Sequence, residues 1–139
     1  MAGISKILAD TSGIVSMLDN SDRYHAEVVK VIEKSTLLIP TTILLEVDYL
    51  TTKYLGEGIA RVFLSDVLAG NFTYLQVELA DLQRALEIMS QYKGVPLGLV
   101  DSSIVALAER YRIQKILTLD RRHFSLIRPA KIEYLELLP

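Results

Sequence analysis

Four carboxylates in this chain stand beside strongly apolar runs, where an acid is costly unless it is paired, hydrogen-bonded or bound to a cation. They are Asp10 after Ile7-Leu8-Ala9, Glu46 in Leu44-Leu45-Glu46-Val47, Asp101 after Gly98-Leu99-Val100, and Asp120 after Ile116-Leu117-Thr118-Leu119. A metal ion stabilises several such acids at once, so the set favours a shared metal site over four separate structural roles.

The chemistry of such a site follows from its donor atoms. Two carboxylates about 4 Å apart repel by about 4 kcal/mol at an effective dielectric constant of 20, and a divalent cation removes that conflict. Oxygen ligands alone select hard ions, Mg²⁺ or Mn²⁺. One or two such ions polarise a phosphoryl oxygen and lower the pKa of an attacking water. The acids therefore predict metal-dependent phosphodiester hydrolysis.

The apolar patterning predicts an α/β fold, a three-layer α/β/α sandwich with a mainly parallel central sheet of four to five strands. The expected strands are 5–9, 36–39, 72–77, 115–119 and an edge strand at 132–137. Helices are expected between them, one of them capped by Asp22 and another running over 99–111. Because ligands bind at the carboxyl ends of parallel strands, Asp10, Asp101 and Asp120 are expected on one rim.

The fourth acid is chosen by the geometry of the helix expected to end near Leu55. Its expected buried stripe comprises Ile43, Val47, Leu50 and Tyr54. On a helical wheel Glu46 lies about 75° from the centre of that stripe and Asp48 about 125°. Glu46 is therefore the better candidate for the rim. Lys53 lies about 20° from Glu46 on the wheel, where it either contacts a phosphate or only solvates that face.

A structural alternative exists for each acid taken singly. Asp10, Asp101 and Asp120 each precede or open an expected helix, where a carboxylate can cap free N–H groups. Capping does not account for Glu46 in the middle of its helix, so a shared site explains the whole set better. Neighbouring hydroxyls either hydrogen-bond the carboxylates or a metal-bound water, or cap locally. These are Thr11, Ser12 and Thr118.

Composition excludes several other classes. The 139 residues fit one domain, 1–139, and the absence of cysteine excludes thiolate metal sites and disulfides. The apolar runs are too short and too interrupted for a membrane span, which favours a cytoplasmic protein. His25 and His123 lack the paired spacing of a zinc site, and no phosphate-binding loop is present. Position 12 is serine, whereas haloacid-dehalogenase-type phosphatases need a second aspartate there.

The order and setting of the four acids closely resemble those of the PIN-domain nucleases, over almost the whole chain. Within that family the chain resembles the stand-alone VapC-type ribonuclease toxins of type II toxin–antitoxin pairs. The resemblance implies that Asp10, Glu46, Asp101 and Asp120 are catalytic and that an RNA substrate is cleaved with Mg²⁺ or Mn²⁺. The metal ligands among them are expected to be Asp10, Asp101 and Asp120.

The same resemblance implies two protein partners, a second copy in a homodimer and a cognate antitoxin. The apolar helices between Thr42 and Leu68 agree with it, because they carry more hydrophobic surface than a lone domain needs. Arg121 and Arg122 directly follow Asp120 and either bind the RNA backbone or form a solvated basic turn. The alternative for the whole chain is a non-catalytic PIN fold that serves as an RNA- or protein-binding scaffold.

Overall fold

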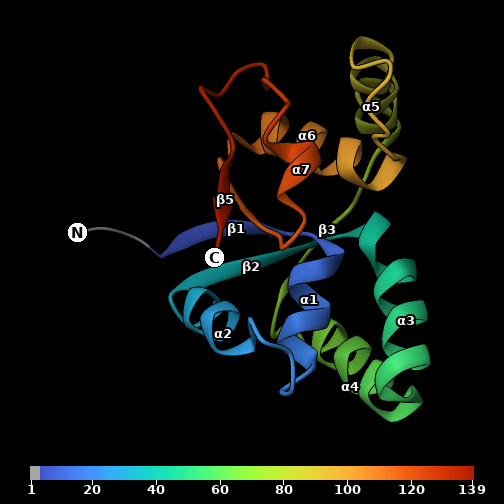
Figure 1. Ribbon diagram of the computed structural model, residues 1–139, viewed down its shortest axis with the longest axis vertical. Helices are drawn as coiled ribbons and strands as arrows, with labels where there is room; N and C mark the ends of the chain where they lie inside the picture. Colours follow the sequence, from blue (N-terminus) through green and yellow to red (C-terminus); the bar gives the residue numbers. More distant parts are fainter. Residues whose placement is uncertain (1–3) are drawn as a thin grey trace.

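The computed structural model describes residues 4–139, which form a five-stranded sheet between two layers of helices (Figure 1). The strands lie in the order β3-β2-β1-β4-β5, and all neighbouring pairs are parallel. Their bounds are β1 (Ser5–Ala9), β2 (Ser35–Pro40), β3 (Thr73–Leu75), β4 (Lys115–Leu117) and β5 (Glu136–Leu138). The predicted fold class is confirmed.

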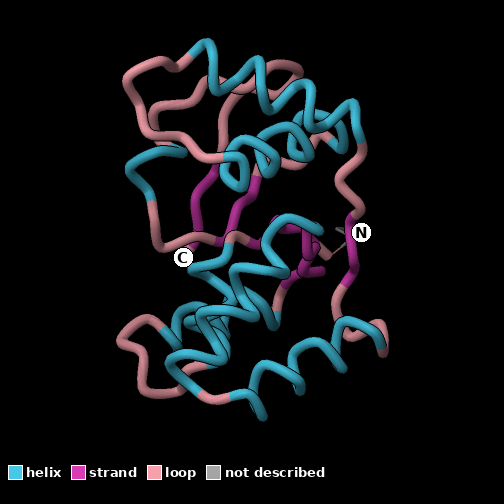
Figure 2. The backbone as a smooth tube through the Cα atoms, turned by 90° about the vertical axis from the view of Figure 1, so that its right-hand side faces the viewer, coloured by secondary structure: helices cyan, strands magenta, loops and turns pink. Residues whose placement is uncertain are grey.

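The helices of residues 4–139 divide between the two faces of the sheet, as Figures 1 and 2 show from two directions. One layer contains α1 (Thr11–Leu18), α2 (His25–Glu33), α3 (Thr41–Leu55) and α4 (Glu57–Leu68). The other contains α5 (Leu79–Gln91), α6 (Leu99–Tyr111) and the short α7 (Arg121–Phe124). Right-handed crossovers explain this division, because the chain moves outward from β1 to β3 and then crosses back to β4 and β5.

The middle strand, β1, is at the centre of the hydrophobic core. Ile7, Leu8 and Ala9 are fully buried, because β1 has helices on both faces and a strand on each side. A strand buried in this way shows a continuous apolar run instead of an alternating one. Asp10 follows it directly and is carried to the edge of the core with it.

Two ion pairs join α5 to α6, the helix that carries Asp101. Arg84 donates to both oxygens of Glu109, from Nε at 2.7 Å and from Nη2 at 3.1 Å. Arg110 does the same to Asp81, at 3.0 and 2.8 Å. Both carboxylates are at least nine-tenths buried, so their paired arginines are required to compensate the buried charge.

Several element boundaries differ from the expectation: β3 is shorter than the expected 72–77, β4 is shorter than the expected 115–119, and β2 is one residue longer at each end than the expected 36–39. The edge strand begins at Glu136 instead of Ile132, because β4 has only three residues and β5 can pair only along that length. The second helix begins at His25, so Asp22 does not cap it; Asp22 instead accepts the Tyr24 N–H in the preceding turn. Among residues 4–139, no helix combines the length and apolar character needed to cross a membrane.

Candidate active site

The four candidate acids line one cavity of about 470 Å³ at the carboxyl edge of the sheet. Asp10 follows β1, Asp101 lies in the first turn of α6, and Asp120 lies three residues after β4. Glu46 enters from the first half of α3. Acids up to 110 positions apart in the sequence are thus brought to one cavity by the parallel order of the strands.

Asp10 is the most buried of these acids, at 5% exposure. Its Oδ2 accepts hydrogen bonds from the hydroxyls of Thr118 at 2.8 Å and Ser12 at 3.2 Å. The Ser12 hydroxyl in turn accepts the Leu119 N–H at 2.9 Å, and the Thr118 hydroxyl accepts the Asp120 N–H at 3.0 Å. The Asp10 carboxylate is therefore held by one hydroxyl from the first turn of α1 and one from the end of the neighbouring strand β4.

Gly13 allows this close approach of α1 to β4. A Cβ atom at Gly13 would lie 2.6 Å from Leu117 Cγ and 2.8 Å from the Leu117 carbonyl oxygen. Any larger residue would push α1 away from β4 and separate Ser12 from the Leu119 N–H. The glycine therefore positions the hydroxyl that contacts Asp10.

Electrostatic strain is concentrated at Asp10 and Asp101. Burial raises the pKa of Asp10 to about 6 from its ordinary 3.8; the Thr118 hydrogen bond opposes this, and the charge of Asp101 adds to it. Burial also raises the pKa of Asp101, a contact with His123 lowers it, and the charges of Asp120 and Glu46 raise it further. The acids therefore interact as one charged cluster.

Neither Asp10 nor Asp120 makes the side-chain hydrogen bond of a helix cap, as judged within residues 4–139. The capping alternative thus fails at the two acids that follow strands. For Asp101, the neighbour at hydrogen-bonding distance is the His123 ring, with Nδ1 3.3 Å from Oδ2.

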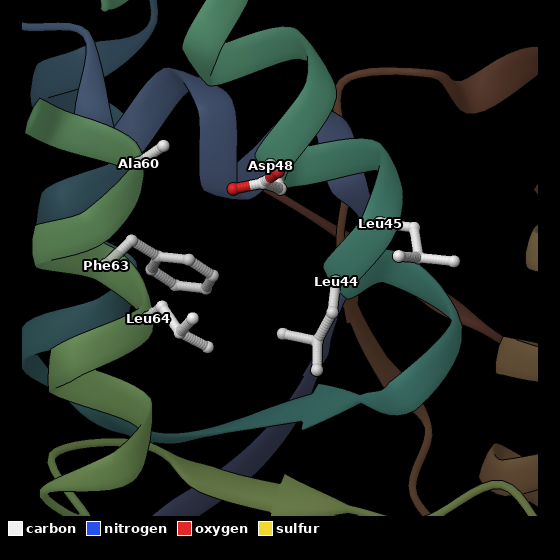
Figure 3. A pocket seen from close by; sticks show the side chains of 6 residues that line it. All are labelled: Leu44, Leu45, Asp48, Ala60, Phe63 and Leu64. Atoms are coloured by element: carbon white, nitrogen blue, oxygen red, sulfur yellow. The ribbon is translucent and has the colours of Figure 1, made fainter. Parts of the chain in front are cut away.

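The two acids of α3 face different hollows. Glu46 Oε1 accepts a hydrogen bond of 2.6 Å from the Thr11 hydroxyl and lines the cavity with Asp10. Asp48 instead lines a separate hollow between α3 and α4, where it lies opposite Phe63 (Figure 3). The helical wheel places the two acids on these same sides of α3.

Two further side chains, to which the sequence gives other roles or none, also line the cavity. The sequence gives His123 no zinc-site spacing and predicts that Asp22 caps a helix, yet both side chains border the cavity. Asp22 Oδ2 accepts from the Ser16 hydroxyl at 2.7 Å and from the Tyr24 N–H at 2.9 Å. The one available signal for His123 is its position three residues after Asp120, one helical turn away.

The two arginines after Asp120 have different surroundings. Arg121 donates through Nη2 to the carbonyl oxygens of Leu137, at 3.4 Å, and of Pro139, which ties it to β5. Arg122 is 88% exposed, and its Nε lies 4.0 Å from Asp120 Oδ1. Arg122 is therefore the freer of the two at the rim of the cavity.

The donor set fits a hard divalent cation in its chemistry. Carboxylate and hydroxyl oxygens line the cavity, and burial, with a smaller contribution from the charge of Asp101, raises the pKa of Asp10, so a cation there would compensate a desolvated negative charge. As their side chains stand, no three of the histidines and acids in residues 4–139 lie close enough together to hold one ion. Glu46 and Asp101 are instead engaged by Thr11 and His123.

Comparison with known proteins identifies the family. A model of the PIN domain matches residues 7–128 of the chain. The chain belongs to the PIN-domain family. This PIN domain is 33% identical to Ribonuclease VapC26 of Mycobacterium tuberculosis (strain ATCC 25618 / H37Rv) over 125 residues, which cover 88% of the chain and 93% of that relative. The match places it among the VapC ribonucleases of the family.

Solved structures show the same fold at lower identity. The sarcin-ricin loop cleaving toxin VapC20 of Mycobacterium tuberculosis superimposes with a TM-score of 0.80 at 18% identity, covering 91% of this chain and 98% of that one. A chain of a toxin-antitoxin complex from Klebsiella pneumoniae superimposes with a TM-score of 0.67 at 23% identity, covering 91% and 94%. These matches confirm the fold, and the family model together with the 33% identical Ribonuclease VapC26 confirms the predicted resemblance to PIN-domain VapC proteins.

Proposed function

We propose that this PIN domain is a cytoplasmic endoribonuclease that hydrolyses RNA phosphodiester bonds with Mg²⁺ or Mn²⁺ and acts as the toxin of a toxin–antitoxin pair. The observation that carries the proposal is the cavity lined by four acids from separate parts of the chain, with the pKa of two of them raised. Raised carboxyl pKa values in a cleft are typical of functional sites. The similarity to Ribonuclease VapC26 supports RNA as the substrate.

Each acid has a role in this proposal. Asp10, Asp101 and Asp120 would hold the metal, which when bound polarises the phosphoryl group and acidifies the attacking water. Asp10 is preorganised by Thr118 and Ser12, and Asp101 is oriented by His123. Glu46 is oriented by the Thr11 hydroxyl at Oε1, and its Oε2 is the atom we assign to accept the proton of the water.

Neutralisation of the four acids by bound cations would favour RNA binding. The chain has a net charge of −2, so without the four acids the remaining charge is +2. Two divalent cations at the cavity would neutralise the four acids and leave a mildly basic protein for the RNA backbone, whereas one would bring the net charge to zero. We assign Arg122 at the rim as a phosphate contact, with Arg121 holding β5 beside it.

The proposed protein partners are an antitoxin and a second copy of the chain. The hairpin of α3 and α4 exposes large apolar side chains, with Leu45 82%, Val62 59% and Leu68 80% exposed. A hollow of about 300 Å³ lies between the two helices (Figure 3). Apolar surface of this kind is typical of protein interfaces. The similarity to a chain of a solved toxin-antitoxin complex supports the antitoxin.

The test of the proposed function is metal-dependent cleavage. Purified protein is incubated with a pool of tRNA, rRNA and mRNA, with Mg²⁺ or Mn²⁺ and with EDTA, and new RNA ends are mapped. Asp10→Asn and Asp101→Asn should each remove most cleavage, and the double variant should be scarcely worse, because ligands of one ion act as a unit.

The outcomes separate an enzyme from a scaffold. Folded variants that still cut RNA refute the assignment of these acids. The scaffold alternative is supported instead if the wild-type protein binds RNA without cutting it and the double variant binds RNA with the same affinity.

A further inference from the structure

The acid cavity continues away from the sheet between α1 and α3. These two helices leave the same edge of the sheet, after β1 and β2, and run side by side (Figure 1). Beyond the acids, Val15 and Ser16 line the cavity on the α1 side and Leu50 lines it on the α3 side. The cavity is thus open along the helices toward the connection between α1 and α2, where Asp22 borders it.

An exposed cluster of aromatic and basic side chains lies farther along α3. Glu46, Leu50 and Lys53 share one face of the helix at positions i, i+4 and i+7, which places Lys53 about 10 Å beyond Glu46 along the axis. Lys53 Nζ lies 5.8 Å from the ring centre of Tyr49 and 5.2 Å from that of Tyr54. The two tyrosines are 64% and 66% exposed.

The connection between α1 and α2 carries a similar pair next to Asp22. The Arg23 guanidinium lies 4.7 Å from the ring centre of Tyr24. Within residues 4–139, neither Lys53 nor Arg23 has a carboxylate oxygen within 4.0 Å. Both side chains are exposed, so their positive charges are available to an external anion. Arg23 directly follows Asp22 and Lys53 lies three residues after Leu50 in the sequence. Asp22 and Leu50 both line the cavity.

Aromatic rings beside unpaired cations suit one class of ligand in particular. Single-stranded nucleic acid is bound by rings on which bases stack and by cations that contact phosphates, largely without sequence preference. An interface with another protein would instead favour a continuous apolar surface, which here lies on the other side of α3, over α4. The distance of about 10 Å from Glu46 corresponds to about three stacked nucleotides.

We propose that the strand of RNA being cleaved runs from the acid cavity along α3, stacks a base on Tyr54 and places a phosphate against Lys53. Tyr49 and the Arg23–Tyr24 pair border the same track. This inference rests on the proposed ribonuclease function and adds the path of the substrate. It assigns affinity for longer RNA to side chains outside the acid cluster.

Binding to a fluorescein-labelled single-stranded RNA of ten nucleotides tests the track, measured by anisotropy in EDTA with Asp101→Asn protein. In this background Tyr54→Ala should weaken binding about tenfold, because stacking on one ring is lost. Lys53→Met should reduce the slope of log affinity against log salt by about 0.7, the value for one phosphate contact. Both side chains are exposed, so melting temperatures should not change.

Matched controls lie elsewhere on the surface. Tyr134→Ala removes a tyrosine that is 53% exposed on the loop before β5, and Lys34→Met removes an exposed lysine at the end of α2. Both should bind RNA like the background. In otherwise wild-type protein, Tyr54→Ala should lower kcat/KM for the ten-nucleotide RNA and leave a dinucleotide substrate unaffected.

The possible failures are distinguishable. If the track variants bind like the controls while the wild-type protein cuts RNA, the track is wrong and the ribonuclease proposal stands. If RNA affinity is unchanged and sedimentation shows that Tyr54→Ala dissociates a dimer, the surface is a protein interface and the track is refuted. If the wild-type protein neither binds nor cuts RNA, both proposals fail together.

Discussion

Replacing Asp10 with asparagine is expected to stabilise this PIN domain above pH 6 when metal is removed with EDTA. The ionised carboxylate is buried at 5% exposure beside the charge of Asp101, and its pKa is raised to about 6. Asparagine has nearly the same shape and no charge. Its amide oxygen can still accept the hydrogen bond that Thr118 donates to Asp10.

The sign and size of the effect of Asp10 on the free energy of unfolding follow from proton linkage. Below pH 3.8 the carboxyl is protonated in the folded and unfolded chains, so it imposes no penalty. Between pH 3.8 and about 6 only the unfolded chain has lost the proton, and stability falls as the pH rises. Above pH 6 the full penalty applies, about 3 kcal/mol for the difference between these pKa values. For a chain of this size that is about 10 °C in melting temperature.

Urea unfolding in EDTA at pH values from 4 to 8 measures the effect. The increase in the free energy of unfolding caused by Asp10→Asn should be near zero at pH 4 and reach its full size by pH 7. Asp48→Asn, which removes an exposed acid of α3, is the matched control and should show no such trend. A gain that is independent of pH, or a loss of stability at pH 8, would refute the account of Asp10 as a strained buried acid.

Three other perturbations separate catalysis from folding. Glu46→Gln should lower RNA cleavage about 100-fold in a folded protein, whereas Asp48→Asn should cleave normally; equal losses would show that the wrong face of α3 was chosen. Millimolar Mg²⁺ or Mn²⁺ should raise the wild-type melting temperature, and no shift would count against a shared carboxylate site. Arg84→Met should lower the free energy of unfolding in urea by about 2 to 3 kcal/mol, because buried Glu109 loses its partner. Arg61→Met, which breaks an exposed pair, should lower it by less than about 0.5 kcal/mol. Equal losses in the two variants would contradict this reasoning.

The strand ends were the most predictable part of the site. Ile7 to Ala9 is an uninterrupted apolar run, which indicates a strand buried on both faces, and the carboxyl ends of parallel strands meet at one edge. The gathering of Asp10 and Asp120 at one cavity follows from those two facts alone. Predicting the position of Asp101 required one further assumption, namely that the loop before α6 returns to the same edge of the sheet.

Contacts set by packing between distant helices were not predictable. His123 meets Asp101 because the single turn of α7 packs beside the start of α6, and no pattern in Arg121–Phe124 encodes that placement. The helical wheel also put Tyr54 in the buried stripe, which was wrong. The last turn of α3 extends beyond the core, so Tyr54 is 66% exposed while Thr51 is fully buried.

The sheet order makes the acid cavity a late product of folding. β1 pairs with β4, and the hydrogen bond from Thr118 to Asp10 joins residues 108 positions apart. A chain synthesised only as far as Gly98 contains Asp10 and Glu46 but neither of the other two acids. Contacts of such long range form slowly and only after most of the chain has collapsed. The proposed ribonuclease activity would therefore be withheld from the nascent chain until β4 has inserted into the sheet.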